Sequence, residues 1–174
     1  MLSDTFAICA TALESAGFGS WHEESSETAP FASLFVVFHI DEADRKYVLQ
    51  GFDAREMAAT MGPTESDFPF GLLQLTFQFP FEVQQQHFPD VARLLHRLNN
   101  LLPVGSFLLA EDDRCVCHRT TIPAEDSGLP TETLVATIKI IQRFCIELSG
   151  LIEATSAGHM SYDDFLSELT KNLQ

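Results

Sequence analysis

The chain has 174 residues, of which 45% are hydrophobic and 20% charged, so it can fold around one hydrophobic core. Its 25 acidic and 10 basic residues give a formal net charge of -15, which disfavours binding to nucleic acid or to anionic membrane surfaces. The 15 Phe, against 1 Trp and 2 Tyr, indicate a thick core, an apolar docking surface, or both.

The first residues lack the cationic start and apolar run of a signal peptide. No apolar stretch approaches the roughly 20 residues that a membrane-spanning helix needs. We therefore expect a cytoplasmic protein with no membrane association. Its four cysteines, Cys9, Cys115, Cys117 and Cys145, should then be reduced thiols.

The N-terminal part of the chain predicts a helix and a β-hairpin. Residues 3–16 place apolar side chains on one helical stripe, and Gly17 suits the end of a helix. A polar loop is expected after Trp21. Residues 31–40 are dense in Phe and Val and predict a strand, and residues 46–52 return as a second strand after an acidic turn.

The middle of the chain carries the clearest strand pattern. It follows an irregular connection over residues 53–69, which holds a short helical turn at 55–61. Residues 71–81 then alternate between apolar and more polar side chains, which predicts a strand with one buried face. The residues on that face are Leu73, Leu75, Phe77, Phe79 and Phe81.

The second half predicts helices around another hairpin. A helix is expected over residues 89–102, and strands 104–110 and 114–122 pair around an acidic turn. After a loop, the longest helix spans residues 131–156. A short terminal helix begins at Ser161, where Ser and Asp three residues apart approximate a capping box.

These elements define an α+β fold. Their order is helix, three strands, helix, two strands and long helix, followed by a short C-terminal helix. No repeat or internal boundary divides the chain, so residues 1–174 are expected to form one domain, with residues 159–174 as an appended helix.

Residues in the second half resemble the YbjN family of bacterial sensory transduction regulators. The similarity is carried by residues 98–107 (LNNLLPVGSF), by the acidic turn at 111–113, and by residues 119–129 ahead of the long helix. Residue-level similarity covers about residues 94–152. The order of elements over residues 3–156 resembles the type III secretion chaperone-like fold.

This resemblance implies a five-stranded antiparallel sheet flanked by helices. Secretion chaperones of this fold are small, acidic homodimers that hold extended segments of client proteins. The helix after Gly158 is an addition to that pattern, so the dimer geometry of those chaperones does not transfer directly.

A Cys-x-Cys-His sequence is the strongest candidate for chemistry. Alternation along a strand places the thiols of Cys115 and Cys117 on one face and His118 on the other. A metal site usually needs a second pair of ligands, which the sequence does not offer. Buried structural thiols are therefore favoured, no metal or cofactor is expected, and a metal- or redox-active protein using the two thiols remains the alternative.

The other polar residues form no catalytic motif. The six histidines are scattered, and the chain has no nucleophile elbow, phosphate-binding loop or dinucleotide motif. Acidic residues cluster in predicted turns, where carboxylates are usually solvated. The sequence therefore favours a protein that is not an enzyme.

Apolar residues that need cover are the candidates for partner binding. They are Phe31, Phe35 and Phe38 on the first predicted strand, and Phe165 and Leu169 on the terminal helix. The terminal stripe either packs on its own domain or extends to a second subunit or a client. The leading prediction is a non-enzymatic, chaperone-like or regulatory domain that binds an unidentified protein and forms a homodimer. A narrower alternative is a dedicated type III secretion chaperone for one effector.

Overall fold

The computed structural model describes residues 2–27, 29–60, 71–124 and 130–172 of the chain. The helices and strands follow one another in the order 3₁₀ helix η1 (Leu2–Thr5), α1 (Phe6–Ser15), β1 (Gly19–Glu23), β2 (Ser33–Ile40), β3 (Lys46–Asp53), α2 (Ala54–Thr60), β4 (Gly71–Glu82), η2 (Gln85–His87), α3 (Phe88–Asn99), β5 (Ser106–Ala110), β6 (Cys115–Ala124), α4 (Thr131–Ser156) and α5 (Tyr162–Asn172).

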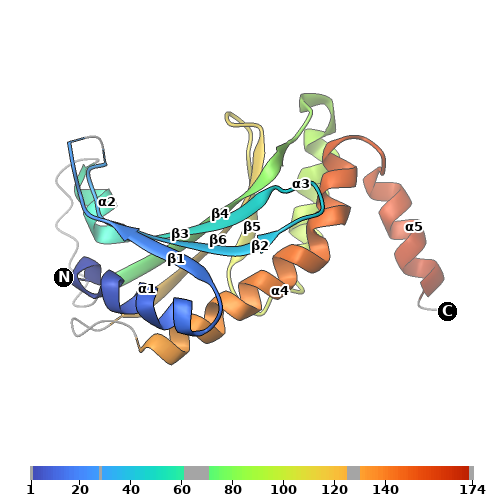
Figure 1. The fold of residues 1–174 in the computed structure, drawn as a ribbon. Coiled ribbons are helices and arrows are strands. Elements are labelled where there is room, and N and C mark those ends of the chain that lie inside the picture. Colours follow the sequence, from blue (N-terminus) through green and yellow to red (C-terminus); the bar gives the residue numbers. More distant parts are fainter. Residues whose placement is uncertain (1, 28, 61–70, 125–129, 173–174) are drawn as a thin grey trace.

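The described strands form one antiparallel sheet of six strands in the order β1-β2-β3-β4-β6-β5 (Figure 1). The prediction of five strands is wrong by one, because the sequence pattern does not predict β1, which ends where the expected polar loop begins. β1 pairs with β2 along its whole length, from Gly19 opposite Val37 to Glu23 opposite Ser33. Its side chains are mostly exposed, so this edge strand is held by backbone pairing and lacks the apolar alternation that marks the other strands.

One face of the sheet is covered by helices α1, α3 and α4 (Figure 1). The predicted helices are confirmed, with α4 at its expected bounds and α3 ending three residues earlier than expected. α4 can cover the sheet because its apolar residues recur at helical spacing. The buried apolar residues of this helix are Leu134, Ile138, Ile141, Cys145 and Ile152.

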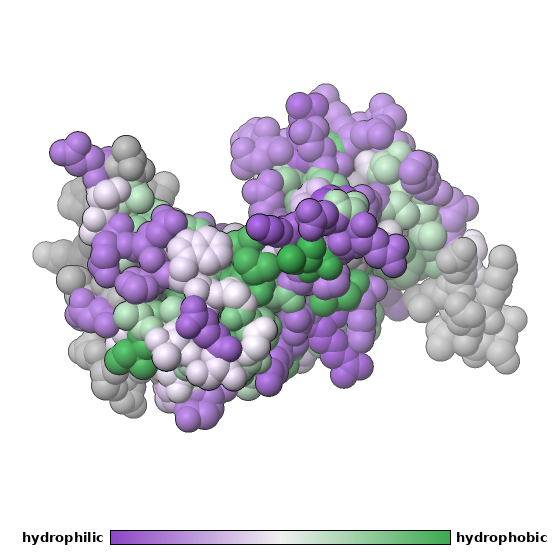
Figure 2. Space-filling model, viewed as in Figure 1, coloured by the Kyte–Doolittle hydropathy of each residue, from purple (hydrophilic) through white to green (hydrophobic). Residues whose placement is uncertain are grey.

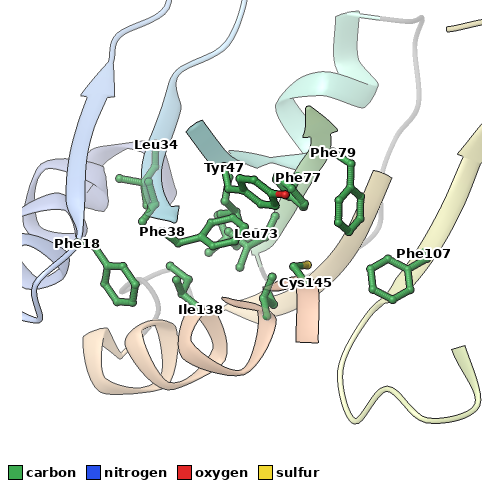
Figure 3. Close-up of a cluster of buried hydrophobic side chains, with 14 of the residues drawn as sticks. Phe18, Leu34, Phe38, Tyr47, Leu73, Phe77, Phe79, Phe107, Ile138 and Cys145 are labelled. Carbon is green, nitrogen blue, oxygen red and sulfur yellow. The ribbon is translucent and has the colours of Figure 1, made fainter. Parts of the chain in front are cut away.

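The core lies between the sheet and the helices α1, α3 and α4. Figure 3 shows Ile138 and Cys145 of α4 on the side to which Phe38, Tyr47 and Phe77 of the sheet point. The ring of Phe77 lies 5.0 Å from that of Phe38 and 5.3 Å from that of Tyr47, centroid to centroid. The predicted buried face of β4 is confirmed, since Leu73, Leu75, Phe77 and Phe79 are buried and Phe81 packs against them partly buried.

Two predicted connections lie partly outside the described residues. The irregular connection at 53–69 contains α2, which extends the expected helical turn to its N-terminal side, and residues 61–69 are outside the description. The loop before α4 is likewise described only at its ends, since residues 125–129 are outside.

Helix α5 projects from the end of the molecule that carries α3 (Figure 1). It begins at the predicted capping box, in which the Asp164 amide donates to Ser161 Oγ and the Ser161 amide donates to Asp164 Oδ2, both at 3.1 Å. Arg93 of α3 lies 4.2 Å above the centre of the Tyr162 ring and 3.6 Å from the carboxylate of Asp163. The first turn of α5 is therefore attached to α3.

Candidate binding surface

The face of the sheet opposite α1 and α4 is called the open face here. Paired residues of antiparallel strands point to the same side, so the register gives its composition. A row of side chains crosses all six strands on this face. Its members are Trp21, Phe35, Gln50, Thr76, Arg119 and Ser106.

The half of the open face formed by β1, β2 and β3 is apolar. The Trp21 ring is 41% exposed and stacks on the Phe35 ring, with centroids 5.0 Å apart and planes 14° apart. Val37 lies opposite Val48 beside this stack, and Ile40 at the end of β2 is 50% exposed. We call these five residues the apolar patch. Figure 2, in which β1 is in front, shows apolar residues gathered at the centre of the view and bordered by hydrophilic ones.

The middle of the open face is polar. On β4 it carries glutamine and threonine side chains, which are partly buried or exposed. Gln50 donates to Ser33 Oγ at 3.0 Å, and Gln74 donates to Thr76 Oγ1 at 3.4 Å. Amides and hydroxyls of this kind satisfy part of their hydrogen bonding across the face and can exchange it for bonds to a ligand.

Acidic turns border the open face. β2, β4 and β5 run in the same direction, so the β2–β3 and β5–β6 turns lie at the same end of the sheet. The opposite end carries the acidic residues that close β1. The exposed acidic residues of these segments are Glu23, Glu24, Glu42, Asp44, Glu111, Asp112 and Asp113, against the exposed bases Lys46, Arg114 and Arg119.

Arg45 ties the β2–β3 turn to α4. Its guanidinium contacts Asp41 at 2.6 Å and both carboxylate oxygens of Glu153, at 2.6 and 3.0 Å. Hydrogen bonds to Glu153 and Asp41 raise the pKa of Arg45. Burial would raise the pKa of Asp41, but the hydrogen bonds from Arg45 outweigh it and lower that pKa. Because the Arg45 charge is used inside this network, it does not neutralise the remaining acids of the turn.

The structure places the predicted partner-binding residues in three different settings. Phe35 lies in the apolar patch, and Phe31 is partly buried at the end of the same face, 5.3 Å from the Phe52 ring. Phe38 is 4% exposed and belongs to the core under α4. Phe165 is partly buried on α5, 6.1 Å from the Tyr162 ring, and the Leu169 side chain lies outside the described residues.

Four patch residues are absent from the five that were predicted to bind a partner: Trp21, Val37, Val48 and Ile40. The sequence pattern predicts no strand at Trp21, so no face could be attributed to it. Ile40 is brought to the open face by a register shift between Val37 and His39, which the sequence pattern does not reveal.

The thiols of Cys115 and Cys117 are in contact on the open face, with 3.6 Å between their sulfurs. Cys115 is buried and Cys117 half-buried. Burial, followed by the hydrogen bond with Cys115, raises the pKa of Cys117 to about 12. In the described ranges no cluster of three or more His, Cys, Asp or Glu could hold a metal ion. Cys9 and Cys145 are buried on their helices, α1 and α4.

His118 points to the opposite face from the two thiols, as the strand alternation predicts. It is 1% exposed, packs 5.5 Å from the Phe107 ring, and its Nε2 lies 3.2 Å from the Val104 carbonyl oxygen, to which it donates. His118 is buried because β6 is an interior strand whose inner face meets the core.

Burial of His118 lowers its pKa, so the folded protein should lose stability in mild acid. The contribution of the neutral His118 ring to the free energy of unfolding is present above the unfolded pKa of about 6.5. It is lost as the pH falls through the folded pKa. Urea unfolding at about pH 7.5 and about pH 5.5 measures how far the free energy of unfolding drops between the two. This drop should be smaller in His118→Gln than in the native chain. His96→Gln, at an exposed position, should keep the native drop. Equal pH dependence in all three proteins would contradict this assignment.

The described residues define an α+β domain with α1, α3 and α4 on one sheet face, whose other face combines an apolar patch with acidic borders. No helix within the described ranges is long and apolar enough to cross a membrane.

Residues 69–148 match the family model YbjN, described as "Putative bacterial sensory transduction regulator". The match runs from β4 into α4 and confirms the predicted resemblance to this family. The family is described as a regulator rather than as an enzyme. No match was found among curated proteins or solved structures.

Proposed function

We propose that this protein is a non-enzymatic regulator that binds an extended segment of another protein on its open face. The observation that carries the proposal is the exposed Trp21–Phe35 stack, over which the described residues place no helix. Aromatic side chains that remain exposed on a rigid element are frequent anchors of protein interfaces. The YbjN match supports a regulatory role, since the family description names one.

The chemistry of the face supports a partner with alternating apolar and basic side chains. Apolar groups would lose their contact with water against the apolar patch, at about 25 cal/mol per Å² buried. Lysines and arginines would face the acidic turns at the two ends of the sheet, whose charge is not neutralised by Arg45. An extended segment suits this face because its side chains alternate with the same period as those of the sheet.

The homodimer and the cytoplasmic location belong to the same proposal. The homodimer is supported by the resemblance of the element order to secretion chaperones, and the chaperone-like fold is proposed on the same ground. Light scattering of the purified chain would test the dimer by its mass.

A direct test uses a labelled ten-residue peptide in which Leu and Lys alternate, with a Leu–Glu peptide of the same pattern as its control. We expect fluorescence anisotropy to show binding of the basic peptide that weakens steeply as salt is added, since salt screens the acidic turns. The acidic peptide should bind much more weakly. Equal binding of both peptides, or none of either, would contradict the proposed partner chemistry.

A further inference from the structure

The Cys115–Cys117 pair has the geometry of a two-thiol site. Both residues belong to β6, and alternation along the strand brings their side chains to the open face. Cys117 pairs with Gln78 and Leu108, and Cys115 with Glu82 and Ala110. Since Cys117 is only half-buried, a small ligand can reach its sulfur from the open face, and the sulfur of the buried Cys115 lies 3.6 Å further on.

The distance between the sulfurs selects the geometry of the atom that could bind both. With the sulfurs 3.6 Å apart, an atom bonded to each at about 2.3 Å, the length of a zinc–thiolate bond, would have an S–X–S angle of about 100°. This angle is strongly bent. It suits tetrahedral or pyramidal centres and does not suit an ion that binds two thiolates in a line.

The number of available ligands separates the tetrahedral from the pyramidal case. A structural Zn²⁺ site takes four protein ligands. In the part of the chain that the structure describes, no third His, Cys, Asp or Glu joins the two thiols in a metal-holding group. A trivalent atom with pyramidal geometry makes three bonds. If one of them already holds an organic group, only two sulfurs are needed to complete it, and thiolates favour soft elements.

We propose that Cys115 and Cys117 form a binding site for trivalent arsenicals that carry one organic group. In the reaction, R–As(OH)₂ and two thiols give R–As(S–Cys)₂ and two molecules of water. Two As–O bonds break and two As–S bonds form, and each thiol proton leaves with a hydroxide as water. Arsenic stays trivalent, so no oxidant or reductant is needed. This site does not depend on the proposed binding of a protein segment.

The test treats the full chain with phenylarsonous acid in an excess of a monothiol, which removes adducts held by a single cysteine. Intact mass measurement under native conditions should show one phenylarsenic group per chain. Cys117→Ser should lose this adduct, and so should Cys115→Ser. The matched control is the double variant Cys9→Ser, Cys145→Ser, which removes the two buried helix thiols and should keep the adduct.

Three outcomes would overturn the site. They are an unmodified native chain, an adduct that persists in Cys117→Ser, and loss of the adduct in the double control while that variant remains folded. Because Cys117 is half-buried, its Ser variant is expected to fold, which circular dichroism would check. A Zn²⁺ titration is the second arm: tight, Cys117-dependent binding of one Zn²⁺ without an arsenical adduct would replace the two-ligand site with a four-ligand one.

Discussion

Replacing Trp21 by Ala should weaken binding of the basic peptide by about 2 kcal/mol, which is roughly thirtyfold in Kd. The reason is the position of Trp21, which is exposed on the outermost strand of the apolar patch and supported from one side by Phe35. Truncation removes the largest apolar area that a ligand can cover there. The free energy of unfolding should fall by only about 1 kcal/mol, the worth of one aromatic pair. Anisotropy titrations and urea unfolding of the same preparations measure the two effects.

The matched control is Ile8→Ala. Ile8 is 63% exposed on α1, which lies on the helix-covered side of the sheet. The Ile8→Ala variant removes an exposed apolar side chain that lies away from the open face, so peptide binding should be unchanged. If both variants bind as the native chain does, the open face is not the binding surface.

Replacing Gly105 by Ala should destabilise the fold by about 2–5 kcal/mol. Gly105 precedes β5 with a φ of 72°, which is strained for a residue with a side chain. A Cβ at this position would also lie 2.6 Å from Cε1 of His118 and would overlap Thr120 Oγ1. Both neighbours are buried on β6, so neither can move away without disturbing the core. Urea unfolding would show the loss as a lower midpoint with an unchanged slope.

Gly150→Ala provides the control for Gly105→Ala. Gly150 lies inside α4, is exposed, and has open space where a Cβ would be. Ala favours the helix over Gly by about 1 kcal/mol, so this variant should be more stable than the native chain. A loss of stability at Gly105 no larger than about 1 kcal/mol would show that the strand–loop junction adapts to the added methyl group.

The sequence predicts most of this fold because most of its elements have one buried side. β4 alternates between apolar and polar residues, and α4 repeats its apolar residues at helical spacing, so each pattern matches one element type. β1 has no such pattern. It exists because β2 offers it a row of backbone partners, and pairing between distant segments leaves no periodic signal in the five residues that accept it.

The candidate surface is harder to predict than the fold. The alternation along β2 separates Phe35 from Phe38, but it does not say which side the helices will cover. The packing of α1 and α4 on the sheet decides that Phe38 is in the core and Phe35 is available. The shared face of Cys115 and Cys117 required no such knowledge, because two residues of one strand separated by one position always point the same way.

The position of Trp21 also gives the protein a built-in optical reporter. The chain has 1 Trp and 2 Tyr, so its indole emission comes from one place, and that place is the apolar patch. A ligand that covers the ring should shift the emission to shorter wavelength as water is removed from around the indole. Unlabelled candidate proteins can therefore be compared directly with the native chain, and a Phe35→Ala variant changes the patch while keeping the reporter.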